Sequence, residues 1–112
     1  MEKFLFLYRG KEGGHGLSPE AMQKHMEKWY AWMGDLAKKG IMGASEPLQP
    51  TGKQVSGSKK VVTDGPFIEA KEMIGGYTVV NAKDINEAVE IAKGCPVFEV
   101  DGKLEVRPIQ KM

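Results

Sequence analysis

The sequence predicts an α+β fold in which two helices cover one face of a mostly antiparallel sheet. Three observations lead to this prediction. Two segments, 18–40 and 84–94, carry apolar residues at helical spacing between clear start and stop signals. Short runs of alternating or β-branched residues surround them, and glycines and prolines divide these runs into strands. Because the chain has 112 residues, we expect residues 1–112 to form a single domain with one modest core.

The first predicted strand, Phe4–Tyr8, has apolar residues on both of its faces. Alternation places its three aromatic residues on one face and Leu5 and Leu7 on the other. The two predicted helices are enough to cover one of these faces, so we expect the second face to need another cover. A glycine-rich loop follows at 10–16, but it lacks the spacing of either phosphate-binding motif. We interpret it as a flexible connection.

The first helix begins at Ser18, whose side chain can cap it, and the proline that follows suits the first helical position. It ends at Gly40, where a left-handed residue is usual. At about 100° per residue, its apolar side consists of Met22, His25, Met26, Trp29, Trp32, Met33 and Leu36. His25, at the edge of this stripe, has two interpretations. It is either a partly buried histidine bonded to a backbone carbonyl, or a general acid or base at a pocket rim, since imidazole titrates near neutrality.

Residues 41–63 predict an interrupted strand followed by a hairpin. Two prolines near the start cannot donate to a sheet ladder, so this strand belongs at an edge or stops early. Turn residues then surround an isolated Val55, and the next strand, Val61–Thr63, leads to Asp64. Met73–Asn81 is the longest predicted strand, and its paired glycines indicate a bulge, a bend or a close backbone approach.

The second helix begins with a capping box at 84–87 and cannot continue past Pro96. A turn signal at 101–102 leads to a final strand, 104–108, whose proline again favours a sheet edge. The resulting order is strand, helix, strand, strand, helix, strand. This order is the ferredoxin-like pattern, with an antiparallel βαββαβ sheet.

Composition excludes several classes of function. Sixteen lysines and arginines against 15 acidic residues leave a net charge of +1, so we expect no nucleic-acid or membrane partner. No apolar run approaches the roughly 20 residues that cross a bilayer, and no signal-peptide pattern is visible, so we expect a cytoplasmic protein. The single cysteine, Cys95, is expected to be a small buried hydrophobe. His15 and His25 show no metal-ligand spacing, so we expect neither a metal nor a cofactor.

The stretch at 62–72 collects groups able to bind or move protons. Asp64 supplies a short acceptor side chain, the glycine and proline after it fix a turn, and Phe67 needs an apolar environment. Charges of both signs then follow at Glu69, Lys71 and Glu72. Asp64 also has a plainer interpretation, in which its carboxylate caps its own turn.

This stretch, Val62-Thr63-Asp64-Gly65-Pro66-Phe67 with its charged continuation and Gly75-Gly76-Tyr77, resembles the signature of the DGPF or YCII-related family. Further matches run in the same order from about Phe4 to Ile109. The resemblance implies a ferredoxin-like monomer that dimerises through its open sheet face into a dimeric α+β barrel. That homodimer agrees with the two apolar faces of the first strand. The resemblance also implies that some relatives are enzymes using a histidine and an aspartate in a cleft. It carries over to Asp64, Glu69, Lys71 and Glu72.

Two functions fit these observations. In the first, a small-molecule enzyme, His25 or Asp64 moves a proton in a cleft between the sheet and the first helix. Lys71 then orients an anionic substrate or stabilises developing negative charge. The predicted substrate-binding set is Trp29, Trp32, Phe67, Glu69, Lys71 and Glu72. In the second, a homodimeric ligand-binding or regulatory module holds a small molecule in the same pocket, or docks a partner on its dimer surface, without turnover.

Overall fold

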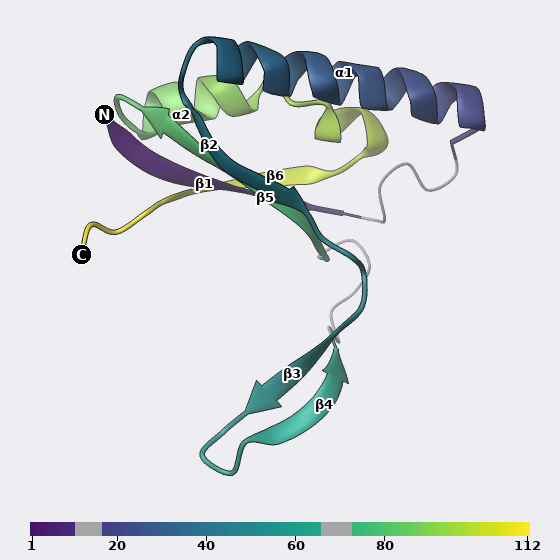
Figure 1. Cartoon of the computed structure of the whole chain (residues 1–112), viewed down its shortest axis with the longest axis vertical. Helices are drawn as coiled ribbons and strands as arrows, with labels where there is room; N and C mark the ends of the chain where they lie inside the picture. The colour runs from purple at the N-terminus through teal and green to yellow at the C-terminus, as the bar shows by residue number, and fades with distance from the viewer. Residues whose placement is uncertain (11–16, 66–72) are drawn as a thin grey trace.

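The computed structural model describes residues 1–10, 17–65 and 73–112. In chain order the elements are β1 (Glu2–Arg9), α1 (Pro19–Lys38), β2 (Met42–Pro47), β3 (Gly52–Ser56), β4 (Val61–Gly65), β5 (Ile74–Ala82), α2 (Ile85–Ala92), the 3₁₀ helix η2 (Pro96–Val100) and β6 (Lys103–Pro108). Figure 1 shows α1 and α2 on one side of an antiparallel sheet. This arrangement confirms the predicted α+β class.

The main sheet has four strands in the order β2-β5-β1-β6. All three pairings are antiparallel, and the strand order is that of a ferredoxin-like fold. β1 and β5 occupy the centre, while β2 and β6, which contain Pro47 and Pro108, lie at the two edges. The edge positions predicted from these prolines are therefore confirmed, since an edge strand can lose a ladder donor at little cost.

The core lies between the sheet and the two helices. Its buried residues are Phe4, Phe6, Tyr8, Leu36, Val80, Ala82, Ala88, Ala92, Cys95 and Val97. Alternation along β1 accounts for the first three, because successive side chains of a strand point to opposite faces. Cys95 is buried, as predicted, with 4% of its surface exposed. Burial raises the pKa of its thiol to about 12. The thiol therefore stays protonated and packs as a small apolar group.

Capping side chains define where both helices begin. Ser18 Oγ accepts a hydrogen bond from Ala21 N at 3.1 Å, which satisfies one free donor at the start of α1. Asp84 Oδ1 accepts from Glu87 N at 2.9 Å, and Glu87 Oε1 accepts in return from Lys83 N at 2.9 Å. Both starts confirm the predicted caps, and α1 ends before Gly40, whose φ of +72° is left-handed.

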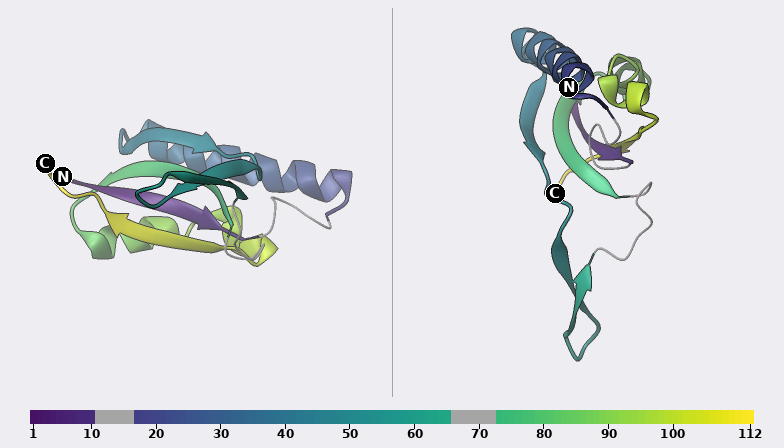
Figure 2. Two further views of the ribbon diagram at one scale, coloured as in Figure 1. Left: turned by 90° about the horizontal axis from the view of Figure 1, so that it is seen from below. Right: turned by 90° about the vertical axis from the view of Figure 1, so that its right-hand side faces the viewer.

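The face of the sheet opposite the helices, here called the open face, carries half-buried apolar residues. Leu5 pairs with Val79 and Leu7 with Tyr77 across β1 and β5, so all four side chains share this face. Figure 2 shows that α1 and α2 lie together on the other side of the sheet. The second apolar face predicted for the first strand is thus present, and the helices leave it open.

The predicted hairpin is formed by β3 and β4, which make a separate two-stranded sheet. It projects from the main sheet on the side away from the helices (Figure 1). Its cross-strand pair Val55 and Val62 is 62% and 59% exposed. The radius of gyration of 15.5 Å reflects this projection, since a compact chain of this length has a radius of about 13 Å.

Candidate functional site

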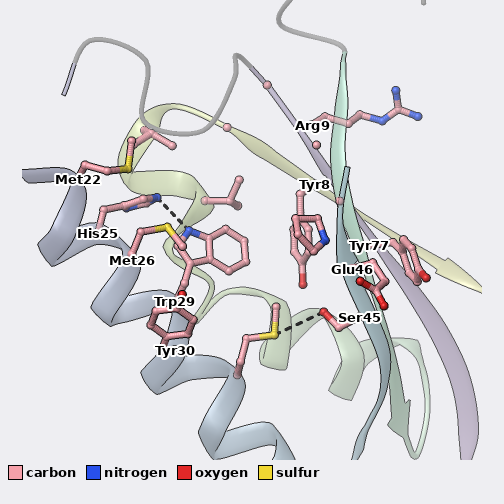
Figure 3. Close-up of a pocket in the computed structure, with 18 residues that line it drawn as sticks. Tyr8, Arg9, Met22, His25, Met26, Trp29, Tyr30, Ser45, Glu46 and Tyr77 are labelled. Atoms are coloured by element: carbon pink, nitrogen blue, oxygen red, sulfur yellow. Dashed lines mark hydrogen bonds between the residues drawn. The ribbon is translucent and has the colours of Figure 1, made fainter. Parts of the chain in front are cut away.

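A cavity of about 360 Å³ lies between the sheet and the part of α1 that runs from Met22 to Met33. Figure 3 shows the α1 side chains along one wall and Tyr8 and Ser45 toward the strands. The residues that form most of its wall are Met22, His25, Met26, Trp29, Tyr30 and Met33 of α1, Tyr8, Ser45 and Gly76 of the sheet, and Val97 and Val100 of η2. A concave, mainly apolar site of this size is typical of small-molecule binding.

Small residues on the sheet leave room for this cavity. A Cβ added at Gly76 would lie 3.0 Å from the carbonyl oxygen of Glu46, so the two strands approach too closely for a side chain there. The pairing of β1 with β5 shifts by one residue between Tyr8 and Arg9, opposite the glycine pair. The bulge and the close backbone approach predicted from these glycines are both present.

Among the described residues, His25 is the least exposed titratable side chain in the cavity wall. It is 6% exposed, and its Nε2 accepts a hydrogen bond from Trp29 Nε1 at 2.9 Å (Figure 3). Its Nδ1 lies 3.5 Å from Glu99 Oε2. The expected backbone carbonyl partner is replaced by an indole and a carboxylate. His25 is thus held at both ring nitrogens, which leaves the ring little freedom to rotate.

Glu99 links this imidazole to a lysine. Its Oε1 accepts from Lys28 Nζ at 2.9 Å, and its side chain is 46% exposed. The Lys28 ammonium holds the pKa of this carboxyl below its usual range, partial desolvation opposes the shift, and the contact with His25 adds to it. Glu99 is therefore ionised near neutrality and presents a negative charge to the imidazole.

A chain of hydroxyl groups runs beneath the cavity. Tyr8 donates to Thr78 Oγ1 at 2.6 Å, Thr78 and Ser45 share a hydrogen bond of 2.7 Å, and Ser45 donates to Met33 Sδ at 3.7 Å. Burial raises the pKa of Tyr8 well above its usual range, although the hydrogen bond to Thr78 opposes the shift. Tyr8 is therefore a neutral donor at any physiological pH and cannot act as a base.

The tryptophans predicted to bind substrate occupy different environments. Trp29 lines the cavity and packs edge-to-face on Tyr8, with ring centroids 4.9 Å apart. Trp32 stacks on Phe6 at 6.4 Å, and its indole nitrogen is 3.2 Å from where a Cβ of Gly94 would lie. Trp32 is therefore packed against the core, behind the cavity wall.

Of the residues predicted in the Asp-Gly-Pro-Phe stretch, Asp64 is the one that lies within the described chain, and it does not line this cavity. Asp64 lies in β4, on the projecting hairpin, where its side chain is 85% exposed and 2.7 Å from Lys53 Nζ. It is not among the residues that line the cavity. The other four, Phe67, Glu69, Lys71 and Glu72, lie outside the described residues. The catalytic role of Asp64 and the binding roles of these four residues stay predictions.

Sequence reasoning missed Glu99, Ser45 and Thr78. Glu99 is 74 positions from His25, so no local spacing connects them. For the two hydroxyl residues a signal existed, because Thr78 alternates with the apolar residues of β5 on the core side and must find a partner there. The described residues contain no group of three His, Cys, Asp or Glu side chains placed to hold a metal ion. None of their helices is long and apolar enough to span a membrane.

A family model described as the YCII-related domain matches residues 3–112, and the chain belongs to this family. The resemblance predicted from the Asp-Gly-Pro-Phe stretch is thereby confirmed. A similar solved structure is 5-chloro-2-hydroxyhydroquinone dehydrochlorinase from Burkholderia phenoliruptrix AC1100, in complex with 2,5-dihydroxybenzoquinone. It is 14% identical, the alignment covers 98% of this chain and 95% of that chain, and the TM-score is 0.51. At this identity the similarity shows the fold alone. No curated protein matches the chain.

Proposed function

We propose that this member of the YCII-related family is an enzyme that binds a small molecule in the cavity under α1 and exchanges a proton with it at His25. The observation that carries the proposal is the 6% exposed imidazole in the wall of a cavity of about 360 Å³. An unprotonated imidazole nitrogen can take a proton once the Trp29 N–H that it accepts is displaced by a bound ligand, and a buried position favours direct transfer from that ligand. The imidazolium that results can return the proton to the product.

The lining indicates the kind of ligand. Met22, Met26 and Met33 offer flexible, polarisable contacts, and Trp29 offers a flat aromatic surface. These side chains suit a small, mainly apolar molecule with few polar groups. The similar dehydrochlorinase fold holds 2,5-dihydroxybenzoquinone, which supports a small planar ligand for a chain of this shape.

The alternative is a ligand-binding or regulatory module without turnover. The observation that favours it is the hydrogen bond from Trp29 Nε1 to His25 Nε2, which occupies the nitrogen that would act as the base. In this second function the same cavity binds its ligand while that bond persists. Asp64 has no contact with the cavity in the described chain, so both functions are argued from His25 and not from Asp64.

A thermal-shift screen against small aromatic and aliphatic metabolites tests ligand binding. A ligand at a hundredfold excess over its dissociation constant stabilises the folded chain by about 2.7 kcal/mol, so modest ligands register. We expect His25→Ala to weaken the response while His15→Ala, the chain's other histidine, leaves it unchanged. Asp64→Asn is screened in parallel to test its predicted role.

Each compound that binds is then followed by NMR for chemical change. Turnover that His25→Ala abolishes supports the enzyme, and binding without turnover supports the non-catalytic module. A wild-type protein that binds no compound, or a ligand response equal in wild type and His25→Ala, would contradict both functions at this cavity.

We also propose that the chain acts as a homodimer that covers the open face. The support is physical: Leu5, Leu7, Tyr77 and Val79 form an apolar patch that the helices do not cover. The β3–β4 hairpin projects on the same side (Figure 1), where a second copy would lie beside it, and an isolated hairpin is only marginally stable in water.

Sedimentation of the wild type and Leu7→Lys tests the homodimer. In a two-fold interface the new lysines would meet their own copies or enter an apolar contact, so we expect dissociation. The matched control is Ile85→Lys on α2, where Ile85 is already 43% exposed. A wild-type monomer at micromolar concentration, or equal dimerisation of both variants, would refute the proposed interface.

A further inference from the structure

His25 contacts Glu99, a residue that does not line the cavity and that the proposed function does not use. Trp29 donates its indole N–H to Nε2 at 2.9 Å, and a nitrogen that accepts a hydrogen bond carries no proton. The single proton of the neutral imidazole therefore lies on Nδ1. That nitrogen is 3.5 Å from Glu99 Oε2.

The backbone that carries Glu99 lies against α1 and is folded tightly on itself. Val97, two residues earlier in η2, is 7% exposed and donates its N–H to Cys95 Sγ at 3.5 Å. After η2 the chain turns back at Asp101, with φ of 61°, into Gly102. A Cβ at Gly102 would lie 2.5 Å from Val97 Cγ2, so only glycine allows this tight return.

The two oxygens of Glu99 are divided between two partners. Oε1 accepts from Lys28 Nζ at 2.9 Å, and Oε2 faces His25 Nδ1. Lys28 and His25 lie three positions apart on α1, so they share one side of the helix. This arrangement aims an ionised carboxylate at the imidazole from behind the cavity wall, which is the relation that sets the tautomer of many functional histidines.

We propose that Glu99 is the positioning residue of His25: it holds the imidazole in the Nδ1–H tautomer, so that Nε2 is the nitrogen presented to the ligand. Lys28 keeps the carboxylate turned toward the ring. Trp29 occupies Nε2 until a donor group of the ligand replaces its N–H. When that donor passes its proton to Nε2, Glu99 stabilises the imidazolium. The steps that involve a ligand rest on the proposed function, but the assignment of the tautomer does not.

Nitrogen NMR of the imidazole measures the tautomer directly, in protein without ligand at about pH 8, where histidine is mainly neutral. We expect the Nδ1–H form of His25 to dominate in the wild type. Glu99→Ala should lower the ratio of Nδ1–H to Nε2–H about tenfold, as for the loss of one hydrogen bond to a charged group. Glu99→Gln, whose amide oxygen still accepts, should restore part of the ratio.

The matched control is Glu90→Ala on α2, because Glu90 Oε1 also lies 2.9 Å from a lysine, Lys93. It should leave the ratio unchanged. A wild-type His25 in the Nε2–H form would overturn the proposal, and so would a ratio that Glu99→Ala does not change.

Chemical modification by diethyl pyrocarbonate separates positioning from simple packing. Mass spectrometry distinguishes His25 from His15 after reaction at about pH 8. If Glu99 positions the ring, Glu99→Ala slows modification of His25 severalfold, because the ring is less often in the tautomer whose unprotonated Nε2 can react when the Trp29 N–H moves away. If Glu99 only shields the ring, the same substitution exposes His25 and speeds the reaction, which would overturn the proposal.

These readouts need no ligand, so the two proposals can fail separately. A protein with the Nδ1–H tautomer that binds no compound would refute the proposed function and keep the role of Glu99. A protein that binds its ligand through His25 with a tautomer insensitive to Glu99→Ala would refute the positioning role alone.

Discussion

The two halves of α1 carry the same apolar repeat but meet the sheet in different ways. In the C-terminal half, Leu36 is 3% exposed and Trp32 stacks on Phe6. In the N-terminal half, Met26 is 38% exposed, and His25 stands in the wall of a cavity. The C-terminal half reaches the core at Trp32 and Leu36, and the N-terminal half borders a space for a small molecule that extends along the helix as far as Met33.

The difference comes from what lies beneath each half. Large side chains such as Phe6 fill the space under the C-terminal half, while Ser45 and Gly76 leave it open under the N-terminal half. The N-terminal half is tied instead to η2 by the polar contacts of Lys28 and His25 with Glu99. Amphipathic periodicity therefore identifies the inner side of a helix, but the opposing surface decides whether that side becomes core or site.

The largest expected effect comes from replacing one apolar side chain by alanine in each half of α1. Leu36→Ala should lower the free energy of unfolding by about 2–5 kcal/mol, because it leaves a void in packed surroundings. Met26→Ala should lower it by less than about 1 kcal/mol, because Met26 already borders open space. Urea unfolding of both variants gives the comparison. Equal losses would mean that the N-terminal half is packed as tightly as the C-terminal half.

The sequence was sufficient to predict those parts of the fold that depend on local chemistry. Ser18 and Asp84 cap their helices through bonds to backbone groups a few residues away, and Pro47 and Pro108 exclude a central strand position. These signals act over a few residues, so they appear in the sequence. The two-faced apolar pattern of β1 likewise followed from alternation alone.

The candidate site was only partly predictable because it depends on distant contacts. His25 and Trp29 were predicted, since they lie one turn apart on one helix. Glu99 approaches them only because the chain folds back through η2. Asp64 was expected in the same cleft, but local turn chemistry does not determine the direction in which a hairpin projects. A motif can thus be recognised before its position relative to the cavity is known.

A smaller effect is expected at Tyr8, which lies where the two halves of α1 meet and contacts both Trp29 and Trp32. Tyr8→Phe keeps these ring contacts but removes the hydrogen bond to Thr78, so we expect a loss of about 1 kcal/mol. Tyr77→Phe, on the open face, is the control and should change stability by less than about 0.5 kcal/mol. Thermal unfolding of both variants at equal concentration checks the difference. No loss in Tyr8→Phe would mean that Thr78 is satisfied by Ser45 alone.

The smallest effect concerns the polar attachment of the N-terminal half. The pKa of Glu99 is lowered in the folded chain, chiefly by Lys28, so the ionised carboxylate stabilises the native state. This contribution is present above the usual titration range of glutamate and is lost as the pH falls through the lowered folded value. Salt should weaken it as well, because the side chain is 46% exposed.

Amide hydrogen exchange compares the wild type with Glu99→Gln from neutral to acidic pH. We expect the substitution to reduce protection around Lys28 but not around Leu36 at neutral pH, because the C-terminal half is held by apolar packing. This difference in protection between the wild type and Glu99→Gln should disappear below the folded pKa of Glu99, where both proteins carry a neutral side chain at position 99. The same substitution at Glu90 on α2 should leave both halves of α1 unchanged. A difference that persists in acid would mean that Glu99 holds the helix by packing and not by charge.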